Sequence, residues 1–217
     1  MRDVLQVFIW LLILSGGIAF CVAARRLGLA VTYIRDILHI FTGVWVFGWR
    51  FWENPAIPSV FVVLVFAVVL VLPYLDAGFF RKFIASVSDA DETWRGIVLY
   101  VFSYAAFTAA GMNYAMFPAA AALLSLSFGD GAGGICGRLF GRRFYELPWT
   151  KKKSIEGSLI VFAASLISII ISGFYFEAGL SLGRAAAAAL IAAIAEAISP
   201  RGLDNLLVPA SVYFYLM

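Results

Sequence analysis

Long runs of apolar residues leave this chain few possible folds. Hydrophobic residues make up 63% of its 217 residues and charged residues only 13%, which is more apolar surface than a water-soluble domain can bury. A helix needs about 20 apolar residues to cross the hydrocarbon core of a bilayer. Eight runs are candidates, several of them short: 4–24, 37–52, 57–75, 97–111, 115–128, 158–176, 180–199 and 203–217. We therefore predict an all-α, polytopic membrane helix bundle of about eight transmembrane helices, forming one integral membrane domain over residues 1–217.

The positively charged residues predict the orientation of this bundle. The chain has 16 Lys and Arg residues, and eight spans leave only Arg2, Arg50 and Arg184 on one side of the membrane. The other thirteen lie on the opposite side, which the positive-inside rule assigns to the cytoplasm. We therefore expect both termini outside and two long cytoplasmic loops, at about 76–96 and 129–157. The first run could be read as a secretory signal, but Arg25 and Arg26 directly after it oppose translocation.

The apolar runs carry small residues and, in their middles, few charges. The Ala-rich stretch 185–195 and the serines at 158, 165 and 172 predict helices whose backbones approach closely. No Asp, Glu, Lys, Arg or His lies in the middle of the runs at 57–75, 97–111, 115–128 or 158–176. Ion-coupled transporters place such groups near the membrane midplane, so this pattern speaks against transport. The two cysteines, Cys21 and Cys136, have no CxxC spacing and are predicted to be free thiols.

Ionisable groups instead gather near the cytoplasmic ends of the predicted spans. They are Arg35, Asp36, His39, Asp76, Glu92, Arg95, Asp130, Lys152, Lys153, Glu156, Glu196 and Asp204, with Asn205 beside the last. If these helix ends share one layer, carboxylates, bases and glycines form a ring at one membrane surface. Such a ring predicts a site where a soluble polyanion meets the head of a lipid.

The Gly129-Asp130 step fits a metal and phosphate site. Glycine lets the backbone approach a ligand closely, and Mg²⁺ is typically held by one or two carboxylates together with substrate phosphates. Asp204 with Asn205, and also Glu196, offer further oxygen ligands. The structural alternative is that each acid is a helix cap or a surface charge.

The basic half of the same segment has a complementary use. Residues 151–158, KKKSIEGS, lead directly into an apolar helix, so Ser154 is predicted to be its N-cap. A helix N-terminus beside lysines attracts phosphate. Composition alone favours the alternative, in which the three lysines anchor the segment to anionic lipid. Gly129, Gly131 and Gly134 match G-x-G-x-x-G, but no strand precedes them and no βαβ unit follows. Gly133, Gly137 and Gly141, spaced by four, could form a helix-packing face.

Three motifs in order resemble the CTP-dependent polyprenol kinases, a family of dolichol kinase, phytol kinase and yeast-type diacylglycerol kinase that is related to the CDP-diacylglycerol synthases. The motifs are GDGAGGICGRLFG (129–141), LPWTKKKSIEGS (147–158) and EAISPRGLDNLLVP (196–209), with a weaker similarity in RDILHIFTG (35–43). Together they cover about a third of the chain. The segment 76–96 meets the family pattern only loosely, so the resemblance leaves open whether Glu92 and Arg95 have a role.

The resemblance implies that the γ-phosphoryl group of CTP is transferred to the hydroxyl of a membrane lipid alcohol, with Mg²⁺ as cofactor. Phytol, polyprenol, dolichol and diacylglycerol are the possible acceptors, and no nucleic acid is expected as a partner. Catalytic roles fall to Asp130, Asp204 and Glu196, with Asp130 and Asp204 on the metal. Nucleotide-binding roles fall to Gly129, Gly131, Arg138, Lys152, Lys153, Ser154, Glu156, Gly157, Asn205, His39 and Arg35.

Two other readings remain open at the level of sequence. A CDP-lipid synthase, which is a cytidylyltransferase, would use the same nucleotide but join it to a lipid phosphate and release pyrophosphate. A non-catalytic membrane transporter or scaffold would need neither nucleotide nor metal. We expect the protein to lie in the cell membrane with its active site facing the cytoplasm.

Overall fold

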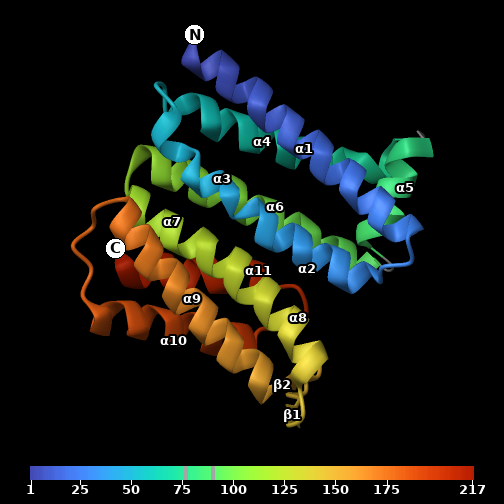
Figure 1. Cartoon of the computed structure of the whole chain (residues 1–217), viewed down its shortest axis with the longest axis vertical. Helices are drawn as coiled ribbons and strands as arrows, with labels where there is room; N and C mark the ends of the chain where they lie inside the picture. Colours follow the sequence, from blue (N-terminus) through green and yellow to red (C-terminus); the bar gives the residue numbers. More distant parts are fainter. Residues whose placement is uncertain (76–77, 89–90) are drawn as a thin grey trace.

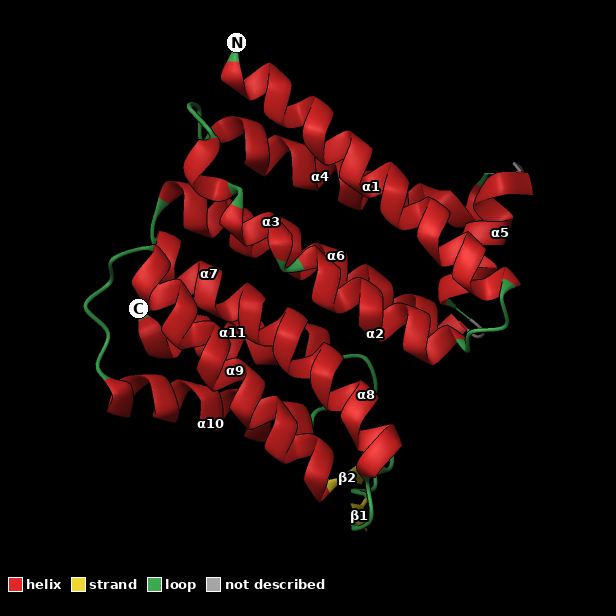
Figure 2. Ribbon diagram, viewed as in Figure 1, coloured by secondary structure: helices red, strands yellow, loops and turns green. Residues whose placement is uncertain are grey.

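The computed structural model describes residues 1–75, 78–88 and 91–217, and nearly all of its regular structure is helical (Figures 1 and 2). The first half contains α1 (Arg2–Arg26), α2 (Val31–Thr42), α3 (Val44–Phe47), η1 (Trp49–Phe51), α4 (Ala56–Val71), η2 (Leu72–Tyr74), α5 (Gly78–Val87) and α6 (Asp91–Asn113). The second half contains α7 (Met116–Leu124), η3 (Ser125–Asp130), α8 (Gly131–Phe140), β1 (Phe144–Tyr145), β2 (Lys153–Ser154), α9 (Ile155–Tyr175), α10 (Leu182–Ile198) and α11 (Asp204–Leu216).

Five helical segments among the described residues are long and apolar enough to cross a membrane. They are Arg2–Arg26, Ala56–Tyr74, Trp94–Asn113, Met116–Phe140 and Ile155–Tyr175. The other predicted spans are shorter or interrupted, because α10 has 17 residues, α11 has 13, and α2, α3 and η1 follow one another as separate pieces. The chain is thus a largely α-helical membrane protein, as the apolar runs predict.

The predicted loop at 129–157 is wrong for residues 129–140. The helix α7 continues through the π-helical turn η3 into α8, so residues 129–140 are helical. Their glycines face another helix: a Cβ on Gly137 would lie 3.4 Å from the Cα of Gly157, at the start of α9. The glycines therefore allow two backbones to pack closely, and the segment that joins α8 to α9 holds only a short antiparallel pair, β1 with β2.

The predicted loop at 76–96 is also partly helical, because it contains α5 and the start of α6. Asp76 lies outside the described residues, and so does the side chain of Glu92. The second predicted run begins earlier than expected. The helix α2 starts at Val31 rather than near residue 37, and so Arg35, Asp36 and His39 lie within it.

Close packing of small residues holds the second half together. Residues 119–124 of α7 are fully buried, and α6, α9 and α11 pack around this helix. The Ala-rich stretch of α10 buries Ala185, Ala188, Ala189 and Ala192 as it packs against α9 and α11. On α9, Ser165 and Ser172 are fully buried too. The prediction of closely approaching backbones is confirmed for these helices, and Cys21 and Cys136 are free thiols as expected.

The two ends of the bundle differ in the elements and charged residues that lie there. Both termini lie at one end, and the β1–β2 pair with the starts of α2 and α9 lies at the other (Figure 1). At the terminal end Arg2 lies 3.7 Å from Glu53, Arg50 lies 3.2 Å from Glu177, and Arg184 donates to the carbonyl of Leu216 at 2.9 Å. The basic residues of the motifs lie at the opposite end, where the site described below is found.

Candidate functional site

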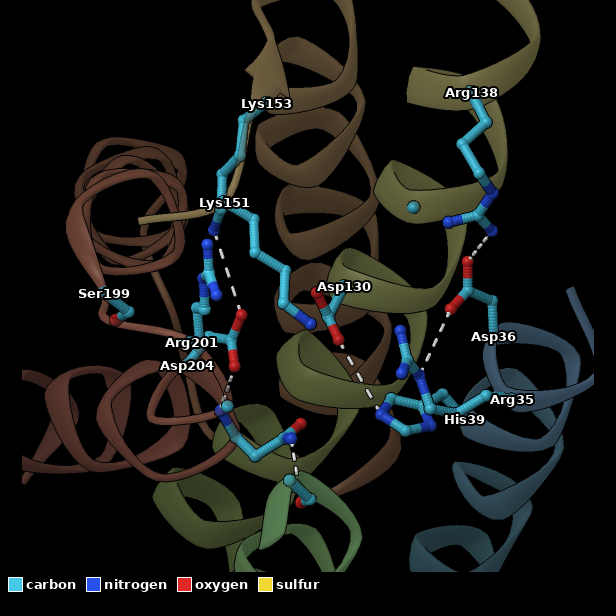
Figure 3. Close-up of a pocket in the computed structure, with 14 residues that line it drawn as sticks. Arg35, Asp36, His39, Asp130, Arg138, Lys151, Lys153, Ser199, Arg201 and Asp204 are labelled. Atoms are coloured by element: carbon cyan, nitrogen blue, oxygen red, sulfur yellow. Dashed lines mark hydrogen bonds and ion pairs between the residues drawn. The ribbon is translucent and has the colours of Figure 1, made fainter. Parts of the chain in front are cut away.

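A polar cavity of about 110 Å³ lies at the bundle end opposite to the termini (Figure 3). It forms where α7 passes through η3 into α8, where α10 ends and where α11 begins, with α2 as its far wall. The lining residues are Arg35, Asp36, His39, Gly96, Asp130, Gly134, Arg138, Lys151, Lys153, Ser199, Arg201, Gly202, Asp204 and Asn205. The three motifs found in the sequence, together with the weaker one on α2, thus meet in one place.

Three carboxylates converge beside this cavity. Asp130, Glu196 and Asp204 each offer an oxygen within 4.8 Å of the other two, although they come from η3, α10 and α11. The ammonium of Lys153 lies among them: its Nζ donates to Glu196 Oε1 at 2.5 Å and to the Glu196 carbonyl, and it lies 3.8 Å from Asp204 Oδ2. Burial disfavours the charge of Lys153, but the carboxylates of Glu196 and Asp204 outweigh this and raise the pKa of Lys153. Lys153 is therefore the counter-ion of the cluster.

Local structure explains how these groups are placed. Asp130 ends the π-helical turn, a rare geometry that is frequent at functional sites. Lys153 is held by the short β pair, in which it lies opposite Tyr145. The next residue, Ser154, caps α9 as predicted, because its Oγ accepts from the Gly157 N–H at 3.1 Å. The cap fixes the point at which the strand turns into the helix, and with it the position of Lys153.

A second ion pair joins α2 to α8. Arg138 contacts the carboxylate of Asp36 directly, and its guanidinium lies 4.7 Å from the centre of the Tyr33 ring. Burial raises the pKa of Asp36 to about 6, and the charge of Arg138 offsets this only in part. A Cβ on Gly134 would collide with the Asp36 carboxylate. Gly134 is therefore required so that α8 can approach the acid on α2.

The floor of the cavity contains an imidazole and an amide. His39 Nε2 lies 3.7 Å from Asp130 Oδ2, too long for a hydrogen bond, and its ring stacks on Tyr100 with 4.0 Å between centres. Asn205 donates through Nδ2 to the carbonyl of Gly96 at 2.9 Å. Its Oδ1 is buried and accepts no hydrogen bond of good geometry among the described residues, although His39 lies beside it. A buried amide oxygen without a donor is costly unless a ligand uses it.

The donor set suits a hard divalent cation. Asp130, Glu196 and Asp204 supply carboxylate oxygens, and Asn205 Oδ1 is a further oxygen on the same cavity. Mg²⁺ takes ligands of this kind and keeps several waters or substrate phosphates as well. Lys153 shares two of these carboxylates, so a metal and the lysine would compete for them.

The structure brings together most, but not all, of the residues predicted from sequence. Arg35, His39, Asp130, Arg138, Lys153, Asp204 and Asn205 line the cavity, and Glu196 contacts Lys153. The other predicted nucleotide-binding residues lie elsewhere. Lys152 Nζ lies 4.5 Å from the centre of the Phe144 ring, and Glu156 accepts from the backbone N–H groups of Arg142 and Arg143. Ser154, Gly157, Gly129 and Gly131 lie at helix contacts.

Seven lining residues were not predicted as site residues: Asp36, Gly96, Gly134, Lys151, Ser199, Arg201 and Gly202. For Asp36 a signal existed, because it lies three residues before His39 and therefore on the same side of a helix. Lys151 could not be told from Lys152 and Lys153 by composition alone. Arg95, whose role the sequence leaves open, is not among the lining residues.

Comparisons of the chain with protein-family models, with curated proteins and with solved structures give no match. A function for this chain is therefore inferred from its own motifs and from the geometry of the cavity.

Proposed function

We propose that the protein is a membrane lipid-alcohol kinase that transfers the γ-phosphoryl group of CTP to the hydroxyl of a polyprenol-type lipid. One observation carries the proposal: Asp130, Glu196, Asp204 and Lys153 converge on one cavity at the end of an apolar helix bundle. A site at this position can receive a soluble polyanion from one side and a lipid head from the bilayer. We place the protein in the cell membrane with this end toward the cytoplasm, because the basic residues gather there.

The reaction makes one bond and breaks another. The lipid hydroxyl oxygen attacks the γ-phosphorus, the bond from that phosphorus to the β,γ-bridging oxygen breaks, and CDP leaves with the electron pair. The hydroxyl proton passes to a carboxylate, for which Asp130 and Asp204 are the candidates. Phosphoryl transfer mainly requires positioning and neutralisation of charge, and the convergent acids and bases of the cavity can provide both.

Asp130 and Asp204 would hold the magnesium ion, with Glu196 and Asn205 beside them. When bound, Mg²⁺ neutralises charge on the phosphate oxygens. The basic lining residues contribute charge of the same sign.

Labelled CTP tests the proposal with purified protein. CTP labelled at the γ- or the α-phosphate is offered with Mg²⁺ and each of phytol, a polyprenol, dolichol and diacylglycerol, and UTP and ATP are tested in parallel. We expect the γ-label on one of these alcohols. The α-label on a lipid phosphate would instead identify a CDP-lipid synthase. No transfer, together with no CTP-induced rise in melting temperature, would favour a transporter or scaffold.

Asp130→Asn provides the matched variant. It keeps the size of the side chain and removes the charge, so we expect a folded protein in detergent that no longer transfers phosphate. Transfer at the rate of the unmodified protein would contradict the role of Asp130.

A further inference from the structure

We infer that Lys151 and Arg35 hold the phosphates of a polyphosphate ligand between opposite walls of the cavity. The inference rests on the proposed function and deepens it, because it assigns the phosphate contacts to a residue pair different from Lys152 and Lys153. Arg35 comes from α2, and Lys151 comes from the segment just before β2. Figure 3 shows both side chains directed toward the middle of the cavity.

Two of the other cations in the cavity are already neutralised. Arg138 is paired with Asp36, and Lys153 is paired with Glu196 and Asp204. Side chains that serve as counter-ions for buried carboxylates cannot turn to a ligand without leaving those carboxylates unpaired, which is costly. They keep the site folded but offer little charge to a phosphate.

Lys151 and Arg35 do not serve as counter-ions in this way. Lys151 is exposed and makes no hydrogen bond or ion pair within the described part of the chain. Arg35 has one ion-pair contact among these residues, from its Nε to Asp36 Oδ1 at 4.0 Å, and that acid is already engaged by Arg138. The charges of both act on the Asp130 carboxylate.

The neighbouring lysine provides the contrast. Lys152 follows Lys151 directly, yet its ammonium lies over the Phe144 ring and is not part of the cavity lining. The three consecutive lysines cannot be distinguished in the sequence, but their environments differ in the structure. Lys151 lines the cavity without an ion pair among the described residues, Lys152 lies outside it, and Lys153 lines it as a counter-ion of Glu196 and Asp204.

The chemistry favours a ligand with several linked anionic groups. Among the described residues, five cations and three carboxylates line the cavity, so a bound anion must contact the bases and avoid the acids. A di- or triphosphate chain offers several linked anionic groups, so different groups can contact Lys151 and Arg35. Charge-assisted contacts from Arg and Lys are the strongest that phosphate oxygens make with proteins.

Inorganic tripolyphosphate tests the inference without any need for a nucleotide base. Its affinity is measured by calorimetry with Mg²⁺ on detergent-purified protein, for the unmodified chain and for Lys151→Met, Arg35→Met, Lys152→Met and Arg143→Met. Loss of one charge-assisted contact corresponds to about tenfold or more in affinity. We expect that loss for Lys151→Met and Arg35→Met, and less than about twofold for Lys152→Met and for the charge-matched surface control Arg143→Met.

Equal losses in all four variants, or none in Lys151→Met, would overturn the inference. Arg35→Lys replaces Arg35→Met if the latter does not fold, and it should bind more weakly than the unmodified chain because it loses the forked donor. Binding of orthophosphate and of micelles that contain phosphatidic acid is measured in the same way. If either binds more tightly than tripolyphosphate, the inference of a polyphosphate ligand is also wrong. If Lys151→Met transfers the γ-label at the normal rate, the inference about Lys151 is wrong but the proposed kinase activity stands. If tripolyphosphate binding depends on Lys151 but the unmodified protein transfers no label, the inference stands and the proposed kinase activity is wrong.

Discussion

At the scale of single residues, Lys153 contacts two of the carboxylates that a metal would need. Its ammonium shares Glu196 and Asp204, two members of the carboxylate cluster. In Lys153→Met these buried acids lose their counter-ion, so we expect unfolding free energy to fall by about 3 kcal/mol or more. Added Mn²⁺ should then raise the melting temperature of Lys153→Met more than that of the unmodified chain.

The matched control is Lys152→Met, which removes the same charge outside the cavity and should behave like the unmodified protein. An equal Mn²⁺ effect on all three proteins would mean that lysine and metal do not compete for these acids.

Asp36 gives the site a dependence on pH. Its pKa is raised from 3.8 to about 6 in the folded chain, chiefly by burial. The folded state therefore holds this proton more tightly than the unfolded state does. The resulting stability is fully present below about pH 4 and is lost as the pH rises through about 6. Each tenfold difference in proton affinity between the two states contributes about 1.4 kcal/mol, so the loss reaches at most about 3 kcal/mol.

The measurement compares denaturation of the unmodified protein and Asp36→Asn between pH 4 and pH 7. We expect the stability of the unmodified protein to fall relative to that of Asp36→Asn over this window. A difference between the two that does not vary with pH would show that the pKa of Asp36 is the same in the folded and unfolded chain.

At the scale of elements, the approach of α8 to α2 depends on a missing side chain. In Gly134→Ala the new methyl group meets the Asp36 carboxylate, which cannot move away easily because it is buried and held by Arg138. We expect a loss of about 1–3 kcal/mol, measured by denaturation in detergent. Gly16→Ala in α1 is the control: its Cβ would meet nothing within 4 Å, so that helix should be unchanged or slightly stabilised. Similar losses in both would refute a specific role for Gly134.

The same elements show how far a sequence can predict this fold. Apolar runs are a local signal, and they correctly predict the helices of the five long apolar segments, whereas the run 37–52 is divided among α2, α3 and η1. The glycines of α8 give a local signal for a turn, but they lie in a helix because α9 packs against their bare backbone. The sequence of α8 alone does not show that α9 packs against it. The start of α2 was missed for a related reason, since polar residues such as Arg35 and Asp36 are compatible with helix but do not extend an apolar run.

The site was predictable to the extent that its residues lie in compact motifs at helix ends. Asp130, Lys153 and Asp204 were expected to converge, and they line one cavity. Lys151 was not chosen over Lys152, because the path of the backbone before β2 decides which of two adjacent lysines faces inward. The spacing of residues along the chain does not predict the path of the backbone before β2.

At the scale of the whole molecule, the two ends of the bundle predict its orientation in the membrane. The short connection between α6 and α7 lies at the terminal end and exposes Tyr114, whereas Arg142 lies at the end that carries the cavity. By the positive-inside rule, the cavity end should face the cytoplasm. An even number of crossings would then place both termini outside.

Cysteine labelling tests this orientation in intact cells. Cys21 and Cys136 are the chain's two cysteines, so Cys21→Ala with Cys136→Ala provides a background without thiols. On it, Tyr114→Cys should react with a membrane-impermeant maleimide in whole cells, and Arg142→Cys should react only after the membrane is opened. The opposite pattern would place the cavity outside, where a CTP-dependent reaction has no nucleotide supply, and it would remove the proposed kinase together with the orientation. Labelling of both in whole cells would contradict a polarised bundle, because the two positions would then lie on one side.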